Sequence, residues 1–339
     1  MNVLLTGAAG LLGGAIAQQL VRAGHDVIGL VHSATDIRGN DGSSVSSVDY
    51  GAERAGHVQV LKGDVSAPDL ALDAECLADL SARIDCVIHC AALVKFEADY
   101  QELAAVNVDG TRHVAAAFPD ARFVHVSTAY SCGIANGPVP EQPHSCEGPF
   151  ANGYERSKAM AEAQLRLIRP DAIIARPSII LGEFGSGTIR SFDTIYRAFK
   201  FIAEGYVNAV PVAPDATLNF VPIDHVVAGI VALAEAEEPA DIVHLAAQTA
   251  FCARRFLELI GSFEGLRCPR ILPVGDEPAG KSRLAARSVA PYLSYFSRNP
   301  EFETDGFSQL TGRPSPDMDE DAMLRQIRFC IDAGFIRPR

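Results

Sequence analysis

Short apolar runs alternate with helical patterns over roughly the first 250 residues of the chain. The first run, Val3-Leu4-Leu5, is followed by Leu12, Ile16 and Leu20, which recur every four residues until Gly24. This spacing predicts a buried strand that leads into an amphipathic helix ending at the glycine. Similar apolar runs predict further strands at 27–31, 58–61, 86–89, 123–126, 173–175 and 242–245, and helical spacing predicts helices at 99–117, 152–168 and 224–237.

The predicted strands are apolar throughout rather than alternately apolar and polar. That pattern is typical of a parallel sheet, because helices cover both of its faces and bury every side chain of the strands. Repeated strand–helix alternation therefore predicts an α/β fold with a doubly wound parallel (Rossmann) sheet. Residues 39–51, which contain several Gly and Ser, are expected to form a flexible surface insertion.

The alternation is lost at 183–216 and again from 250 to the end, where Pro, Gly and aromatic residues become frequent. We expect these segments to form a smaller C-terminal substrate lobe over the carboxyl edge of the sheet, where ligands bind in such folds. The predicted division is 1–182 plus 217–249 for the dinucleotide-binding domain and 183–216 plus 250–339 for the substrate-binding lobe. The apolar residues of 183–216 are compatible with an apolar substrate pocket, although we expect most of them to pack in the core.

Composition narrows the class of protein. The 339 residues are 48% hydrophobic and 21% charged, which is enough apolar content for a sizeable core. A formal net charge of −13 argues against a nucleic acid or an anionic membrane as partner. The cysteines form no CxxC pair and the histidines no ligand triad, so we expect free thiols and no metal site. Without a bilayer-length apolar run or a signal-peptide pattern, we expect a soluble, cytoplasmic protein.

A glycine-rich turn joins the first predicted strand to the first helix. It reads Thr6-Gly7-Ala8-Ala9-Gly10-Leu11-Leu12-Gly13. Glycines at this junction let the backbone turn tightly and approach a pyrophosphate at the N-terminus of the helix. Ordinary tight turns also use glycine, but the position between strand and helix predicts a dinucleotide site. The residues expected to bind the cofactor here are Thr6, Gly7, Gly10, Leu11, Leu12 and Gly13.

The end of the second predicted strand bears on the choice of cofactor. It reads Val31-His32-Ser33 and lacks the acidic residue that binds the ribose 2′-hydroxyl in NAD enzymes. His32 and Ser33 can instead donate hydrogen bonds to a 2′-phosphate, so the sequence favours NADP (NADPH) over NAD. The alternative is that His32 is an ordinary loop residue and that Arg38 or Arg54 meets the phosphate.

Two further strand ends are expected to lie beside the dinucleotide. Asp64, which precedes Val65 after the third of these strands, could accept a hydrogen bond from the adenine amino group. Ala91 and Ala92 follow the next strand, where small side chains allow the dinucleotide to lie close. The neighbouring His89 is expected to be a buried histidine with satisfied hydrogen bonds rather than a ligand.

Tyr154 and Lys158 lie four residues apart in a predicted helix and therefore on one face of it. A nearby ammonium favours phenolate, so we expect Lys158 to lower the pKa of Tyr154 from about 10 toward neutrality. Such a phenol can protonate a carbonyl oxygen as a hydride reaches the carbon. Upstream, Ser127-Thr128 follows the fifth strand, and the Thr128 hydroxyl could polarise the same oxygen. A bare YxxxK pattern often arises by chance, but after a nucleotide loop it becomes the leading interpretation.

These motifs together resemble the extended short-chain dehydrogenase/reductase family over nearly the whole chain. The residues that carry the resemblance are the glycine-rich turn, Asp64, 89–92, Asn107, Ser127-Thr128, Tyr154, Lys158 and Arg176-Pro177-Ser178. The resemblance implies that Tyr154 is the acid–base residue and that Lys158 binds the nicotinamide ribose. It also implies that Asn107 supports the active-site helix and a water relay. Thr128 takes the family's Ser/Thr position, and Pro177-Ser178 would frame the nicotinamide carboxamide.

Within this family the chain is most similar to the thioester-reductase and fatty-acyl-reductase branch, through 126–130, 219–225 and 291–296. The likeness implies NADPH-dependent reduction of an acyl thioester, on coenzyme A or a carrier protein, to an aldehyde or alcohol. An acyl carrier protein could then be a partner, and family members often pair as homodimers. Four basic residues in the tail could meet such acidic groups or form a solvated helix face: Lys281, Arg283, Arg287 and Arg298.

Two other interpretations remain open. The same residues would serve NAD(P)-dependent oxidation, reduction or epimerisation of a hydroxyl or ketone in a sterol, flavonoid or nucleotide sugar. An epimerase would keep its cofactor bound and show no net consumption. A non-catalytic dinucleotide-sensing protein could keep the fold, but it would have little need for Tyr154 and Lys158.

Overall fold

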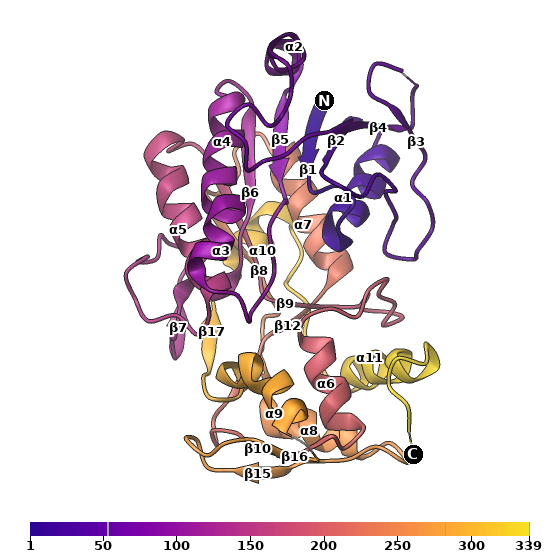
Figure 1. The fold of residues 1–339 in the computed structure, drawn as a ribbon, viewed down its shortest axis with the longest axis vertical. Coiled ribbons are helices and arrows are strands. Elements are labelled where there is room, and N and C mark those ends of the chain that lie inside the picture. Colours follow the sequence, from indigo (N-terminus) through magenta and orange to yellow (C-terminus); the bar gives the residue numbers. More distant parts are fainter. Residues whose placement is uncertain (53, 282, 339) are drawn as a thin grey trace.

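A parallel sheet forms the larger part of the molecule, and a smaller lobe lies beyond the carboxyl ends of its strands (Figure 1). The computed structural model describes residues 1–52, 54–281 and 283–338. Within them, the main sheet has eight strands, all paired in parallel. Their order is β13 (Ile242–Leu245), β8 (Ile173–Pro177), β6 (Arg122–Val126), β5 (Cys86–His89), β1 (Asn2–Thr6), β2 (Asp26–Val31), β4 (Val58–Lys62) and β3 (Ser47–Asp49).

The apolar runs form strands because both faces of the sheet are covered. Leu4 and Leu5, successive residues of β1, are both fully buried but belong to cores on opposite faces. The chain also winds outward from β1 in both directions, toward β2 and β4 and toward β5 and β6. The prediction of a doubly wound parallel Rossmann sheet is therefore confirmed.

Helices pack on each face of this sheet. α1 (Leu11–Arg22) and α7 (Ile223–Glu235) lie together on one face, and α2 (Ala74–Arg83), α4 (Gly110–Ala117) and α5 (Gly153–Ile168) lie on the other. α3 (Tyr100–Ala104) continues through a π-helical turn, Ala105–Asp109, into α4. The predicted helices are therefore confirmed, with their ends shifted by one or two residues. No helix in the described part of the chain has the length and apolarity needed to cross a membrane.

The segment 39–51 is not the flexible insertion that its composition suggested. Its end forms β3, which pairs with β4 at the edge of the sheet. Val45 and Asn40 are buried, at 8% and 5% exposure. The Asn40 amide donates to the Thr188 carbonyl oxygen at 2.8 Å, which ties the segment to the smaller lobe. The composition did not indicate this arrangement, because the segment is held by the buried Asn40 and Val45 and by the pairing of β3 with β4.

The smaller lobe combines short strands and helices. Aromatic rings fill its core: Phe199 lies 4.5 Å from Phe256, and Phe192 stacks on Phe335 at 4.2 Å. Of the aromatic residues of 183–216, Tyr196 and Phe199 are buried in this core, Phe192, Phe201 and Tyr206 pack against it, and Phe184 is exposed. Its strands include β9 (Ile179–Leu181) with β12 (Phe220–Pro222), β11 (Thr217–Leu218) with β14 (Phe251–Cys252), and β15 (Arg270–Leu272), β10 (Val207–Pro211) and β16 (Ala279–Gly280). Its helices include α6 (Ile195–Ala203), α8 (Ala253–Gly261), α9 (Arg283–Val289), the 3₁₀ segment Ala290–Phe296 and α11 (Glu320–Asp332).

The C-terminal segment also returns to the sheet. β17 (Pro300–Phe302) pairs with β7 (Gly137–Val139), and α10 (Asp305–Thr311) contacts β13 and α7. The part of the chain predicted as the substrate lobe therefore includes elements that pack on the Rossmann sheet. The proposed division into two units stays a prediction.

A buried ion pair joins this C-terminal segment to α5. Arg298 Nη2 lies 2.5 Å from Glu155 Oε1, and the two residues are 2% and 0% exposed. The guanidinium stacks on the rings of Tyr130 and Tyr295, at 4.6 and 4.7 Å, and Nη1 donates to the Gly133 carbonyl oxygen. Arg298 is therefore neither a solvated helix residue nor a surface contact for phosphates, contrary to both expectations for it.

We predict that Arg298→Met lowers the free energy of unfolding by about 3–5 kcal/mol, because Glu155 would remain buried without its partner. Urea denaturation followed by circular dichroism measures this change. The matched control is Arg255→Met, which breaks an exposed ion pair with Glu320 and should change stability little. Equal effects of the two substitutions would contradict the assignment of a structural role to the buried pair.

Candidate functional site

The glycine-rich turn forms a cradle that only glycine can line. Gly7 has a φ of +70°, and a Cβ there would lie 2.9 Å from Ala91 Cα. A Cβ on Gly13 would lie 2.1 Å from the Gly7 carbonyl oxygen. Gly10 begins α1 without a side-chain cap, so Leu11 and Leu12 offer their N–H groups at the helix end. This cradle fits the diphosphate of a dinucleotide.

Two buried side chains, Thr6 and His89, connect the glycine-rich turn to the loop after β5 and to α4. The Thr6 hydroxyl contacts His89 Nδ1 at 2.8 Å and accepts a hydrogen bond from Ala91 N at 3.1 Å. His89 Nε2 lies 3.1 Å from the Thr111 hydroxyl, and burial lowers the pKa of His89 to about 3. His89 is thus the buried, satisfied histidine that was predicted. The Thr6 hydroxyl thus makes its two hydrogen bonds with other residues of the protein, His89 and Ala91.

The end of β2 places exposed hydrogen-bond donors where an adenosine ribose would lie. His32 and Ser33 are exposed, and His32 Nε2 lies 3.6 Å from Asp64 Oδ2 on the neighbouring strand end. Hydrogen bonds from the Ser66 hydroxyl and N–H lower the pKa of Asp64. The Asp64 carboxylate therefore stays charged and faces the His32 imidazole.

The two arginines considered for the 2′-phosphate lie at opposite edges of the sheet. Arg38 follows β2 at the carboxyl edge and pairs with Asp36 at 2.6 Å. Arg54 instead lines a hollow with Asn2 and Asp26 at the amino ends of the strands. Arg54 therefore lies at the opposite edge of the sheet from His32 and Ser33, the residues expected to meet the 2′-phosphate.

The other expected cofactor residues follow the ends of β4, β5 and β8. Val65 is buried beside Gly110, and Ala91 and Ala92 are half-buried in the loop after β5. Pro177 ends β8, and the Ser178 hydroxyl is buried without a hydrogen-bond partner in the described part of the chain. A buried hydroxyl of this kind is available to a bound ligand, such as the carboxamide that the resemblance implied.

The proposed catalytic side chains come from β6 and α5. Thr128 follows β6, accepts a hydrogen bond from Tyr130 N at 3.3 Å and donates to the Pro177 carbonyl oxygen at 3.4 Å. The Asn152 side chain caps α5 by accepting from Glu155 N at 2.9 Å. Tyr154 therefore lies in the first turn of α5, with Lys158 one turn further on.

The expected effect of Lys158 on Tyr154 is not what the structure shows. Burial raises the pKa of Tyr154 above its ordinary value, and the charges of Cys90 and Glu155 raise it further. Lys158 Nζ lies 3.2 Å from His125 Nε2, to which it donates. Burial lowers the pKa of Lys158 itself to about 8. The prediction of an acidified tyrosine was wrong because it considered only helical spacing, and not burial or the partner of the ammonium.

Asn107 connects the elements around this helix. It lies in the π-helical turn, donates to the Ser157 hydroxyl at 2.8 Å and accepts from Leu93 N at 2.7 Å. Asn107 thus joins α5 to the loop after β5, in agreement with the supporting role that the resemblance implied. π-Helical turns are often found at functional sites.

Aromatic rings cover Tyr154. Phe96 lies 5.5 Å from the Tyr154 ring and 5.3 Å from Tyr292, and Tyr295 is 6.1 Å from Phe96. The two other tyrosines belong to the 3₁₀ segment Ala290–Phe296 of the smaller lobe. We call Phe96, Tyr292 and Tyr295 the aromatic roof.

Sequence reasoning missed two features of the site. His125 in β6 contacts Lys158 and stacks on His89 at 5.5 Å. Arg176, buried in β8, pairs with Glu162 of α5 at 2.6 Å, and the Ser127 hydroxyl donates to the same carboxylate. The signal for the histidine was its place in an apolar strand, three residues before Thr128. A polar residue in such a strand requires a partner.

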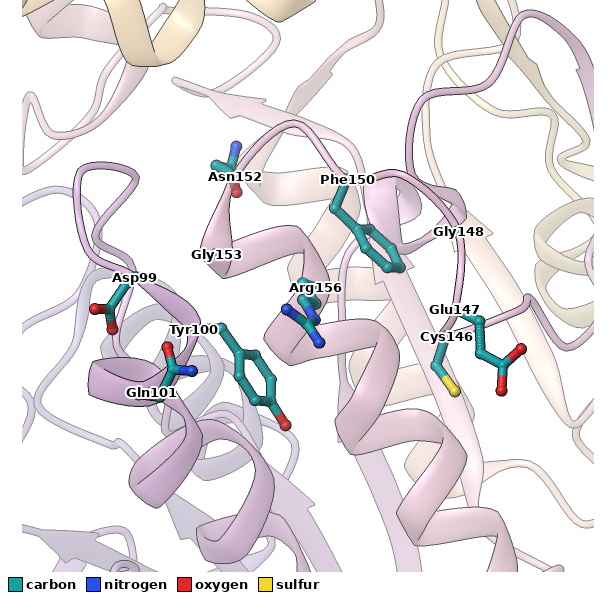
Figure 2. A pocket seen from close by; sticks show the side chains of 10 residues that line it. All are labelled: Asp99, Tyr100, Gln101, Cys146, Glu147, Gly148, Phe150, Asn152, Gly153 and Arg156. Atoms are coloured by element: carbon teal, nitrogen blue, oxygen red, sulfur yellow. The ribbon is translucent and has the colours of Figure 1, made fainter.

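An open cavity of about 570 Å³ lies on the other side of the start of α5 (Figure 2). Arg156 points into it and stacks on Tyr100 at 4.5 Å, with Cys146 and Glu147 on the opposite loop. Tyr154 and Lys158 do not line this cavity. It is therefore separate from the proposed catalytic residues. Within the described residues, no group of three or more His, Cys, Asp or Glu side chains is arranged to hold a metal.

Comparison with known proteins agrees with this geometry. The NAD-binding family described as "Male sterility protein" matches residues 5–230. Nonribosomal peptide synthetase acrB of Aspergillus aculeatus is 30% identical over 70% of this chain and 16% of its own length. L-2-aminoadipate reductase large subunit of Penicillium chrysogenum is 28% identical over 80% of this chain and 21% of its own length. The chain thus spans about a fifth or less of these relatives.

A solved structure supports the same fold. The terminal R domain from the myxalamid PKS-NRPS biosynthetic pathway matches with a TM-score of 0.82 and 24% identity, over 99% of this chain and 92% of that domain. Together with the family match, the fold and the cradle define the class of protein. The chain belongs to the NAD-binding Male sterility family of extended short-chain dehydrogenase/reductases, and is an NAD(P)-dependent oxidoreductase of that type.

The burial of Lys158 predicts a pH-dependent stability. Its pKa is about 8 in the folded chain and 10.5 as the ordinary value. Between these pH values the unfolded chain holds a proton that the folded chain has released, so stability should rise with pH. Relative to Lys158→Met, the wild-type free energy of unfolding should increase by on the order of 3 kcal/mol from pH 7 to pH 11.

Urea denaturation of both proteins at each pH measures this difference, because other titrating groups contribute equally to the two. A difference that stays constant across the range would show that the lysine is not desolvated as the structure indicates.

Proposed function

We propose that the chain uses NADPH to reduce an acyl thioester, carried by coenzyme A or by an acyl carrier protein, to an aldehyde. The observation that carries this proposal is the arrangement of Tyr154 and Thr128 at the carboxyl edge of the sheet, with the aromatic roof above Tyr154. A hydroxyl pair suits a carbonyl oxygen, and the apolar roof suits an acyl chain. A relative that is named as an aminoadipate reductase supports a reductive role for this fold.

The residues would act in the following way. A reduced nicotinamide dinucleotide, with its diphosphate held by the cradle, would supply the hydride for the thioester carbonyl carbon. Thr128 donates a hydrogen bond to the carbonyl oxygen, and Tyr154 protonates it as negative charge develops. The resulting hemithioacetal collapses when the phenolate of Tyr154 takes the proton back and the C–S bond breaks. The products are an aldehyde and a thiolate, which a solvent proton converts to a thiol.

Lys158 has two roles in this scheme. Its ammonium would bind the nicotinamide ribose, as in the related family. Because burial lowers the pKa of Lys158 to about 8, it also exchanges protons near neutral pH. Asn107 would keep α5, and with it both side chains, in place through the Ser157 hydroxyl.

We predict that the protein consumes NADPH and releases free thiol when incubated with acyl-coenzyme A esters or acylated carrier protein. Tyr154→Phe should lower kcat by about 10²–10⁴-fold because the proton donor is lost. Nicotinamide absorbance and a thiol reagent measure the two products independently. Tyr100→Phe is the matched control, since Tyr100 lies in the separate cavity of Figure 2 and should leave kcat unchanged.

The outcomes distinguish the remaining alternatives. NADPH loss with ketones or aldehydes, but no thiol release from any thioester, would favour a carbonyl dehydrogenase. Conversion of a nucleotide sugar without net NADPH loss would favour an epimerase. Full activity of Tyr154→Phe in a folded protein would contradict the mechanism.

For the cofactor, we predict a lower dissociation constant for NADPH than for NADH. The supporting observation is that β2 ends in exposed His32 and Ser33 rather than in an acid. His32→Asp should weaken NADPH binding and leave NADH binding unchanged or stronger, because a carboxylate repels a 2′-phosphate. Fluorescence titration measures both constants, and tighter binding of NADH by the wild type would overturn the assignment.

A further inference from the structure

A guanidinium from the smaller lobe lies against the glycine-rich turn. Arg190 Nη2 donates to the Gly10 carbonyl oxygen at 2.8 Å, although the two residues are 180 positions apart. Arg190 Nε is buried and has no hydrogen-bond partner in the described part of the chain. Nor does Arg190 belong to any of the ion pairs formed by the described residues.

The charges around Arg190 leave its guanidinium incompletely neutralised. Burial lowers the pKa of Arg190, and the nearby charge of Arg38 lowers it further, whereas Asp36 and Asp193 act in the opposite direction. Asp36 is already paired with Arg38, at 2.6 Å. A half-buried cation with an unused donor beside a second cation is a favourable neighbour for an anion.

Two buried amides hold the segment that carries Arg190. Asn40 donates to the Thr188 carbonyl oxygen at 2.8 Å and accepts from Arg190 N at 3.2 Å. From the other side, Gln326 of α11 donates to the carbonyl oxygens of Gly182 and Glu183 at 3.2 and 3.0 Å. Asn40 and Gln326 are 5% and 3% exposed. The guanidinium is therefore presented to the turn by a fixed backbone.

The turn itself offers the remaining groups of an anion site. α1 begins at Leu11, and its N-cap residue Gly10 has no side chain to cap it, so the first N–H groups of the helix and the positive end of its dipole are available to phosphate oxygens. A planar guanidinium can hold two phosphate oxygens at once. We propose that Arg190 is a ligand of the cofactor diphosphate, contributed to the Rossmann site by the smaller lobe. This inference rests on dinucleotide binding and not on the thioester substrate or on the preference for NADPH.

The test is the binding of ADP-ribose, which carries the diphosphate but neither a nicotinamide nor a 2′-phosphate. Arg190→Met keeps the length of the side chain and removes its charge. The dissociation constants of ADP-ribose, NADH and NADPH, measured by isothermal titration, should all rise by about tenfold or more and by similar factors. Arg190→Lys should lose less, because it keeps a charge but not the planar pair of donors. Arg254→Met, at an exposed position of α8, is the matched control and should bind as the wild type.

Two results would overturn the proposal. Unchanged ADP-ribose binding by folded Arg190→Met would show that the guanidinium does not contact the diphosphate. Weaker binding of NADPH alone would place it on the 2′-phosphate instead. If Arg190→Met does not fold, Arg190→Lys decides the question. A smaller loss of affinity, similar for all three ligands, would support the proposal, and unchanged affinity for all three would contradict it. Because no thioester enters these titrations, a failure of the proposed reaction leaves their outcome intact.

Discussion

A charged lysine buried against the sheet constrains the whole catalytic region. Lys158 is 1% exposed, and its ammonium contacts His125 Nε2 at 3.2 Å. Moving an ammonium out of water costs several kcal/mol unless neighbours compensate. His125 can accept this hydrogen bond only when it is neutral, and burial together with the charge of Lys158 holds its pKa well below the usual range. β6 thus presents the neutral His125 ring as the acceptor for the Lys158 ammonium.

Burial also gives Tyr154 a higher pKa, whereas its spacing from Lys158 suggested a lower one. The ammonium is bonded to His125, and burial together with the charges of Cys90 and Glu155 raises the pKa of Tyr154. For a group that must deliver a proton to a developing oxyanion, this direction is useful, because the proton stays on the hydroxyl until the charge appears. The tyrosine is therefore better described as an acid that is kept protonated than as a phenolate held by its neighbour.

Local patterns predicted the parts of the molecule that depend on local sequence. Three features lie within short windows, and their structure followed from the sequence: the glycine-rich turn, the one-turn spacing of Tyr154 and Lys158, and the apolar runs of β1, β2, β4, β5, β6, β8 and β13. The pairs Arg298–Glu155 and Arg190–Gly10 join residues 143 and 180 positions apart. Nothing near either arginine distinguishes it from a surface cation, so neither could be predicted. The edge strand β3 was missed because its stability comes from pairing with β4 and not from an apolar run.

The smaller lobe supplies side chains that contact the proposed catalytic region. It contributes Tyr292 and Tyr295 to the aromatic roof, and Arg298 to the first turn of α5. The two tyrosines differ in how far their replacement would disturb the rest of the site. The Tyr295 ring also stacks on the Arg298 guanidinium at 4.7 Å and meets Tyr130 edge-on at 4.8 Å, so replacing it would disturb the ion pair that holds α5. Tyr292 contacts Phe96 within the roof. Among the described residues, its ring contacts do not include Arg298 or Glu155. If the proposed function holds, substitution of Tyr292 would change substrate preference and keep the geometry of Tyr154, whereas Tyr295 couples the shape of the roof to the position of α5.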